Sequence, residues 1–233
     1  MKRTKLEDRQ LPDYTRGEEI MNMVTHIVGA SFGVVALVLC VVFSAIRHNP
    51  WAIVGSAIYG VMMIYLYTIS SVYHGLISEK PKKVMQVLDH CSIFAMIFGS
   101  YVPVLMTGVR EQSTLIFIIV SVLVFAGCAV CIVFTAIDWK KYAAISMTGY
   151  FAIGWAALLI FYPLYKAYGI EMPLWLIGGG LAYTLGIIFF AKGTHVRYCH
   201  SVFHLFILLG SALHFVAIFK FCILEAYIPI YFK

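Results

Sequence analysis

The sequence predicts an all-helical integral membrane protein, a bundle of seven transmembrane helices. Three observations support this prediction. The 233 residues are 62% hydrophobic and only 12% charged, whereas soluble proteins are about 45–50% apolar and about 25% charged. The mean hydropathy is +0.90. The apolar residues fall into seven runs, and each run is long enough to cross a bilayer, which takes roughly 20 residues.

The composition also excludes several classes of protein. A soluble enzyme or a nucleic-acid binder could not cover this much apolar surface, and a disordered chain would be poor in apolar residues. The net charge of +6 is therefore expected to mark loops beside a membrane. The six cysteines lie in or beside apolar runs and are expected to behave as small buried hydrophobes. Cys128 and Cys131 have CxxC spacing, but without a second pair they do not predict a zinc site.

The spans follow one another along the chain, separated by polar clusters of the kind that form turns. The seven runs are residues 21–46, 51–73, 88–108, 113–137, 142–165, 173–192 and 199–226. The breaks between them are Arg47 to Pro50, Glu79 to Lys83, Arg110 to Gln112, Asp138 to Lys141, Tyr168 to Glu171, and Lys192 with Gly193. None of the runs alternates as the strands of a membrane β-barrel would. We therefore expect helices, with residues 1–19 as a short tail without a signal peptide and residues 20–233 as one seven-helix domain.

The distribution of Lys and Arg predicts the orientation. Twelve of the seventeen basic residues lie in the N-terminal tail or in the loops after the second, fourth and sixth spans. Only Arg47, Arg110 and Lys166 lie in the opposite loops. Basic residues concentrate in cytoplasmic loops, so we expect a cytoplasmic N-terminus and, after seven spans, a C-terminus outside.

Three histidines are predicted to meet at the cytoplasmic end of the bundle. His74 ends the second span, and His200 and His204 begin the seventh. Residues four apart share one face of a helix, so His200 and His204 could hold one metal ion together, and His74 could add a third nitrogen. Three histidine ligands and an open fourth position are typical of a catalytic zinc site. The alternative is that these histidines lie at the interface only because water is near.

Two further residues belong to the same level of the bundle. Ser70 lies one turn before His74 on the same face, and Asp89 begins the third predicted span. A carboxylate there could orient a ligand or hold a metal-bound water, although an acid at a helix N-terminus is also favoured by the helix dipole. Glu18, Asn22 and His26 form a stripe at the start of the first span, and the alternative to a functional role is a polar seam between helices.

The other histidines are not expected to join this cluster. His214 lies ten residues after His204, about 15 Å further along the helix, and is interpreted as a buried hydrogen-bonding residue. His48, His90 and His195 lie near loops without candidate partners. Cys199 adjoins His200 but faces another direction.

These motifs resemble those of the progestin and adipoQ receptor superfamily, in particular its bacterial hemolysin III branch. The resemblance rests on three segments in order and covers nearly the whole chain from Glu18. They are Glu18 to His26, Ser70 to His74 followed by Leu88, Asp89 and His90, and His200 to His204 with His214.

The resemblance implies seven helices, a cytoplasmic N-terminus and a zinc ion near the cytoplasmic face, in the inner membrane of a bacterium. By motif, His74, His200 and His204 match the zinc ligands. Asp89 matches the acid near the zinc-bound water, and Ser70 matches the motif serine. The chain departs from the receptor relatives in its short tail and in His90, where those receptors have tyrosine.

Two functions remain open. The first is a zinc-dependent hydrolase of membrane lipids, since the family resembles alkaline ceramidases at this site and its bacterial branch is linked to lipid homeostasis. The second is a non-enzymatic hemolysin, or a sensor of lipid state, with a structural zinc. Membrane lipids are the expected substrates or ligands. We expect no nucleic-acid partner, the sequence points to no protein partner, and an oligomer remains open.

Overall fold

The computed structural model describes residues 4–226, and its regular elements in that range are all helical. Seven helical stretches are long and apolar enough to cross a membrane, as the sequence predicts. The stretches are α1 (Arg16–Ile46), α2 (Pro50–Gly75), Glu79–Gln112, α5 (Thr114–Asp138), Ala143–Tyr168, α8 (Glu171–Lys192) and Cys199–Leu224. Lys2 and Arg3, which entered the orientation count, lie outside the described residues.

Three of the stretches change helix type along their length. The third stretch joins α3 (Glu79–Val104), the π-helical turn η1 (Leu105–Val109) and α4 (Arg110–Gln112). The fifth stretch joins α6 (Ala143–Trp155), the 3₁₀ segment η2 (Ala156–Ile160) and α7 (Phe161–Tyr168). The seventh stretch joins α9 (Cys199–Ala217) and the π-helical segment η3 (Ile218–Leu224). In the third, Pro103 lacks the N–H that an α-helix requires at that point. The Thr107 hydroxyl donates to the Pro103 carbonyl at 2.8 Å, within the π-helical turn that follows.

Two helices begin earlier than the apolar runs predict. α1 begins at Arg16 instead of residue 21, because Thr15 and Glu18 form a capping box in which each side chain accepts from the other's backbone N–H. α3 begins at Glu79 instead of residue 88, so the expected break from Glu79 to Lys83 is the first turn of a helix. Pro81 is tolerated there because N–H groups in a first turn have no intrahelical partner. Hydropathy marks only the part of a helix that crosses the hydrocarbon.

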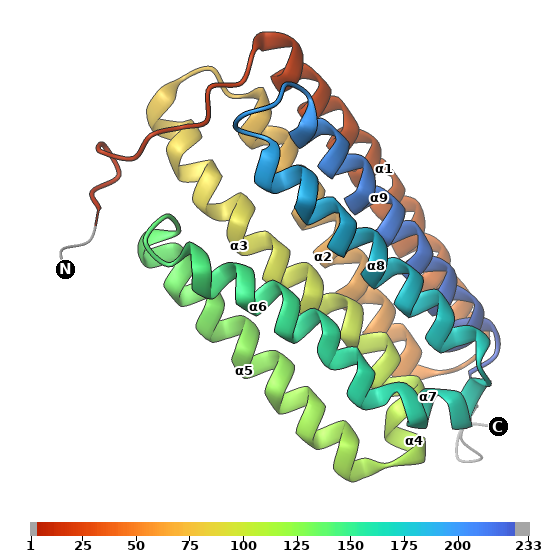
Figure 1. The fold of residues 1–233 in the computed structure, drawn as a ribbon. Coiled ribbons are helices and arrows are strands. Elements are labelled where there is room, and N and C mark those ends of the chain that lie inside the picture. Colours follow the sequence, from red (N-terminus) through yellow and green to blue (C-terminus); the bar gives the residue numbers. More distant parts are fainter. Residues whose placement is uncertain (1–3, 227–233) are drawn as a thin grey trace.

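The bundle closes by packing the first spanning helix against the last. α1 packs along α2, α2 along α3, and α8 along α9, while α1 also contacts α9 (Figure 1). Glycines allow the closest approaches, as is common between membrane helices. A Cβ at Gly60 would lie 2.7 Å from Leu37 Cα, and one at Gly55 would lie 2.7 Å from Pro103 Cα.

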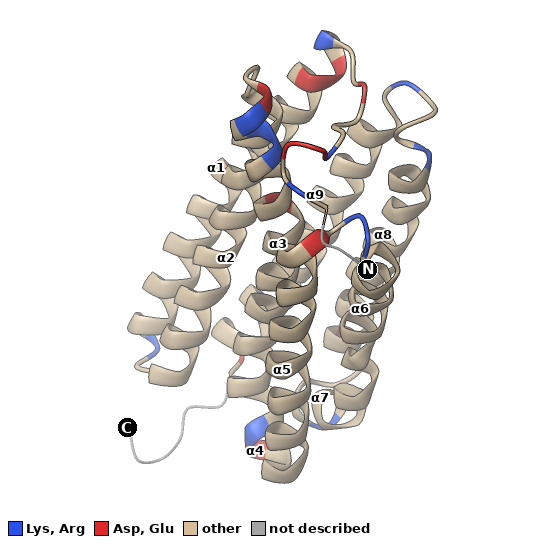
Figure 2. Ribbon diagram, turned by 90° about the vertical axis from the view of Figure 1, so that its left-hand side faces the viewer, with Lys and Arg blue, Asp and Glu red and all other residues tan. Residues whose placement is uncertain are grey.

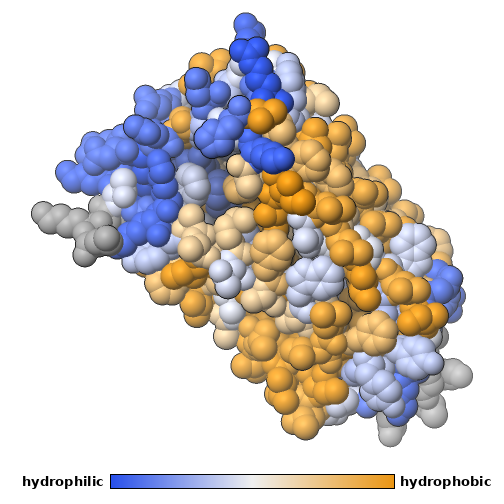
Figure 3. All heavy atoms as spheres, viewed as in Figure 1, coloured by the Kyte–Doolittle hydropathy of each residue, from blue (hydrophilic) through white to orange (hydrophobic). Residues whose placement is uncertain are grey.

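An apolar surface covers the middle of the bundle on the face that Figure 3 shows. Exposed side chains there include Val28, Val122 and Phe125, each more than half exposed. Charged residues gather at the two ends, most of them at the end where α1 and α9 begin and α2 ends (Figure 2). We call this the histidine end. Exposed apolar surface between two charged ends is the pattern of a multi-pass membrane protein.

Candidate metal centre

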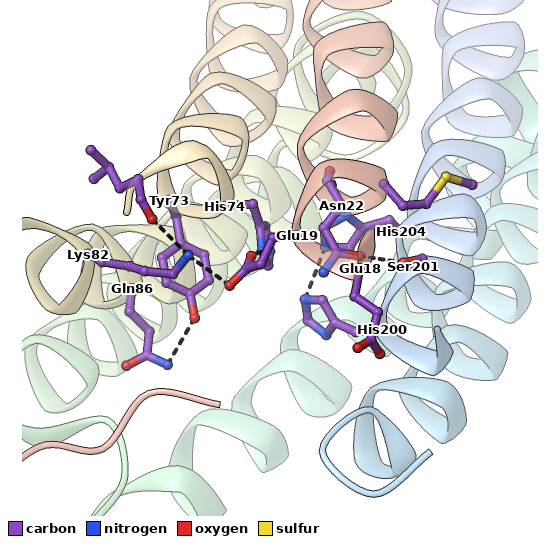
Figure 4. Close-up of polar contacts among 12 residues, drawn as sticks. Glu18, Glu19, Asn22, Tyr73, His74, Lys82, Gln86, His200, Ser201 and His204 are labelled. Atoms are coloured by element: carbon purple, nitrogen blue, oxygen red, sulfur yellow. Dashed lines mark hydrogen bonds and ion pairs between the residues drawn. The ribbon is translucent and has the colours of Figure 1, made fainter. Parts of the chain in front are cut away.

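The structure brings the three predicted histidines together at the histidine end. His74 lies at the end of α2, and His200 and His204 lie in the first two turns of α9. One ring nitrogen from each lies within 4.8 Å of the other two. All three side chains are buried (Figure 4). This cluster could hold a metal ion, and it is the group of that kind found within residues 4–226.

The nitrogens that face the cluster support a cation there. His74 Nε2 is buried without a hydrogen-bond partner among the described residues. His204 Nε2 lies 3.1 Å from His200 Nε2. Buried polar atoms normally have partners, and neutral imidazole nitrogens are common metal ligands. The donor set therefore fits a transition metal that accepts imidazole.

The ring of His204 is fixed by α1. Its Nδ1 lies 3.2 Å from the Asn22 carbonyl oxygen and 3.2 Å from Thr25 Oγ1. Because the Thr25 hydroxyl already points to the carbonyls of Met21 and Asn22, and a carbonyl can only accept, we assign the ring proton to Nδ1. That tautomer leaves the lone pair on Nε2, the nitrogen that faces His200.

The stripe on α1 is a polar seam against α9, as one of the two interpretations predicted. Glu18 accepts from the backbone N–H of Tyr198 at 2.8 Å. Asn22 Oδ1 accepts from the Ser201 hydroxyl at 2.6 Å. The His26 ring stacks on the His204 ring, with centroids 3.6 Å apart. The seam therefore holds the first turns of α9, and with them two of the three histidines, against α1.

Glu19 is a site residue that the sequence did not indicate. Its Oε2 lies 2.6 Å from His74 Nδ1, and its Oε1 lies 2.7 Å from Lys82 Nζ. Glu19 follows Glu18 in the first turn of α1, where acidic residues are favoured by the helix dipole alone, so nothing in the sequence separates it from an ordinary helix-starting acid.

Asp89 and Ser70 lie beside the cluster and line one cavity with His200 and His204. Ser70 and Asp89 lie close enough for their side chains to interact. Asp89 is not part of the metal-ligating group found in the described residues. The interpretation of Asp89 as a helix-starting acid is wrong, because α3 begins at Glu79 and Asp89 lies about three turns inside it.

His90 also differs from its prediction. It lies within α3 and lines the same cavity as Asp89, although the sequence placed it near a loop without partners. Its Nδ1 lies 2.8 Å from the Gln86 carbonyl, and its ring packs on Trp139. His214 is a hydrogen-bonding residue, as predicted, with Nε2 3.1 Å from the Leu176 carbonyl.

The cavity next to the cluster has a volume of about 250 Å³. It extends between α3, α6, α8 and α9, from Asp89 and His200 at the histidine end to Leu164 and Pro173 near the other end of the bundle. Most of its lining is aliphatic or aromatic. An apolar space that runs along the bundle and ends at a polar cluster suits a ligand with a hydrocarbon chain and a polar head.

Residues 4–15 form a strap across the histidine end (Figure 1). Thr4 N donates to Asp138 Oδ2 at 2.8 Å, and Arg9 Nη2 donates to the Ile137 carbonyl at 2.9 Å. At its other end the Tyr14 ring stacks on His200, with centroids 5.1 Å apart. Burial, together with the nearby carboxylates of Glu19, Asp89 and Glu18, raises the pKa of Tyr14 above its usual value, so the phenol stays neutral.

Comparison with known proteins gives consistent matches over most of the chain. Residues 14–215 match the family described as "Haemolysin-III related". The chain is 31% identical to the hemolysin-3 homolog of Bacillus subtilis (strain 168) over 211 residues, which cover 90% of this chain and 97% of that protein. It is 31% identical to hemolysin-3 of Bacillus cereus over 216 residues, covering 91% and 93%. It is 26% identical to the human monocyte to macrophage differentiation factor over 211 residues, covering 88% and 84%.

Proposed function

This chain belongs to the haemolysin-III related family, and on that premise we propose that it is a zinc-dependent hydrolase of membrane-lipid amides with a role in lipid homeostasis. One observation carries the proposal. Three buried histidines converge within 4.8 Å at the end of an apolar cavity that Asp89 and Ser70 also line. Zinc is the metal proposed because three histidines beside an open position are its common catalytic ligand set.

Each residue has a part in the proposed reaction. His74, His200 and His204 would hold the zinc, which would supply a Lewis acid for the amide carbonyl and make a water molecule more acidic. Asp89 accepts the proton of the attacking water and returns it to the nitrogen of the leaving amine, so that the C–N bond breaks to give a fatty acid and an amine. Ser70, which lines the same cavity as Asp89, holds that carboxylate in place.

The cavity supports the choice of substrate class. An acyl chain lying between α3, α6, α8 and α9 would gain about 0.8 kcal/mol for each CH₂ transferred from water. A lipid in the bilayer has already transferred its acyl chain out of water, so it gains little of this free energy on binding. The acyl chain therefore serves to position the amide and does not drive binding. The strap, with Tyr14 on His200, limits access from the aqueous side of the cluster. Substrate then enters from the membrane.

A product assay tests the hydrolase. Zinc-loaded protein in nanodiscs that contain ceramide-like amide lipids is expected to release free fatty acid, and chelation of the metal is expected to stop the release. The name of the Bacillus cereus relative, hemolysin-3, motivates the competing function, a cytolysin with a structural metal. That function predicts leakage of vesicle contents without any free fatty acid from amide or ester lipids, a result that would remove the hydrolase from consideration.

The proposal includes an orientation in the bacterial inner membrane, with the histidine end in the cytoplasm. A labelling experiment checks it with two variants that each introduce one accessible cysteine, Lys80→Cys at the histidine end and Glu111→Cys at the other, both at exposed positions. The background is Cys199→Ser, because the five other cysteines are buried. An impermeant maleimide added to intact cells is expected to label position 111 and to spare position 80 until the membrane is opened. The reverse pattern would contradict the orientation.

A further inference from the structure

We propose that Glu19 is a positioning residue that fixes His74 as a metal ligand, and that Lys82 in turn fixes Glu19. This inference rests on the metal centre of the proposed function and deepens it, because it concerns how one ligand is held. Figure 4 shows Glu19 between His74 and Lys82, with the imidazole on one side and the ammonium group on the other.

The first step is the contact between Glu19 and His74. Glu19 Oε2 lies 2.6 Å from His74 Nδ1, and the His74 side chain has no exposed surface. An ionised carboxylate only accepts hydrogen bonds, so Nδ1 carries the ring proton and donates it. When the ring binds a metal, Nε2 then supplies the lone pair. This is the nitrogen left without a partner, and the one available to the cluster.

The second step is the support of Glu19 itself. Lys82 Nζ lies 2.7 Å from Glu19 Oε1 and donates to the Leu76 carbonyl at 3.0 Å. The ammonium group also lies over the Tyr73 ring, 5.4 Å from its centroid. Lys82 is buried, which is uncommon for lysine unless it is paired. Each carboxylate oxygen of Glu19 thus has its own partner, so the group cannot turn away from His74 without breaking an ion pair.

The third step is that residues from three helices meet at this one ligand. Lys82 lies in the first turns of α3, Glu19 in the first turn of α1, and His74 in the last turn of α2. A carboxylate that accepts from the second nitrogen of a ligating histidine sets its tautomer and raises its basicity, and loss of such a partner typically costs about 10–100-fold in metal affinity. An ion pair that merely joined helix ends would affect stability and leave affinity unchanged.

Glu19→Gln tests the inference in the full-length protein in detergent. The amide oxygen can still accept from Nδ1, but the charge and the ion pair with Lys82 are lost. The zinc dissociation constant, measured by competition with a chromophoric chelator, is expected to rise about 10–100-fold. The melting temperature of the metal-free protein is expected to stay close to wild type, while the increase that zinc produces becomes smaller. The visible spectrum of the cobalt-loaded protein is expected to change, because it reports ligand geometry.

Two further variants make the result decisive. Glu79→Gln removes an exposed carboxylate that pairs with Lys83 at the same end of the bundle, and it is expected to bind zinc like wild type. Lys82→Met keeps an apolar stem but removes the ammonium group, and it is expected to weaken zinc binding less than Glu19→Gln. If Glu19→Gln does not fold, the zinc affinity of Lys82→Met tests the role of Glu19 in its place.

The outcomes separate the inference from the proposed function. Wild-type affinity in both Glu19→Gln and Lys82→Met, with zinc bound by the wild type, overturns the role of Glu19 and leaves the metal centre standing. Failure of the wild type itself to bind zinc overturns both.

Discussion

Replacing His204 with alanine is expected to weaken zinc binding by more than about 100-fold, since loss of a hydrogen-bond partner behind a ligand already costs about 10–100-fold. His204 is almost fully buried, its Nδ1 is held by Asn22, and its Nε2 faces His200 at 3.1 Å. No other side chain is found with these three histidines in a metal-ligating group among residues 4–226. The measurement is zinc content per chain after gel filtration, with about one zinc expected for wild type because there is one cluster.

His214→Ala is the matched control for His204→Ala. His214 lies on the same helix and also makes a hydrogen bond through its ring, to Leu176, but it lies about 15 Å further along α9. The His214→Ala variant is therefore expected to keep its zinc. His74→Ala and His200→Ala are expected to lose zinc as His204→Ala does. Equal zinc loss in all four variants would show that the effect is general damage to the bundle and would contradict the ligand assignment.

Asp89→Asn is expected to lower the hydrolysis of an amide lipid by about 10²–10⁴-fold, the usual contribution of general acid–base catalysis. Asparagine keeps the shape of the side chain but cannot accept the proton from water. The variant is expected to retain its zinc, because Asp89 is not one of the clustered ligands. Fatty-acid release in nanodiscs and zinc content, measured on the same preparation, separate the two properties.

The position of Asp89 sharpens this test. A helix-starting acid would contribute up to about 1 kcal/mol of stability through the dipole, but Asp89 lies about three turns into α3, beyond the range of that effect. Glu79→Gln, in the first turn of the same helix, is the control for the loss of a carboxylate and is expected to keep its activity. Full activity in Asp89→Asn would exclude Asp89 as the proton acceptor.

The sequence predicts the helices well because hydropathy reports directly on burial in lipid. All seven spans appear, and the spacing of His200 and His204 correctly places both rings in one cluster with His74. The starts of α1 and α3 are missed, because their first turns are polar and hydropathy does not register them. That error has a consequence for the site, because it places Asp89 at a helix terminus when it lies in a helix interior.

Other parts of the site have no periodic signal. Glu19 meets His74 across 55 residues of sequence, and Thr4 meets Asp138 across 134. Contacts of this kind depend on how the helices close into a bundle, and a single sequence does not encode them in its spacing. The contacts of the strap are the hardest to predict from the sequence. Residues 4–15 contain no long helix and resemble any short polar tail.

The seam between α1 and α9 sets the order in which the protein can be completed during synthesis. Glu18, Asn22 and His26 emerge from the ribosome with the first span, but Tyr198, Ser201 and His204, which contact them, emerge with the last. Until the seventh span has been made, these polar groups of the first span lack the partners that the finished bundle gives them. The centre can therefore form only as the final step of biogenesis, and a nascent chain arrested before residue 199 would carry six inserted spans and no metal.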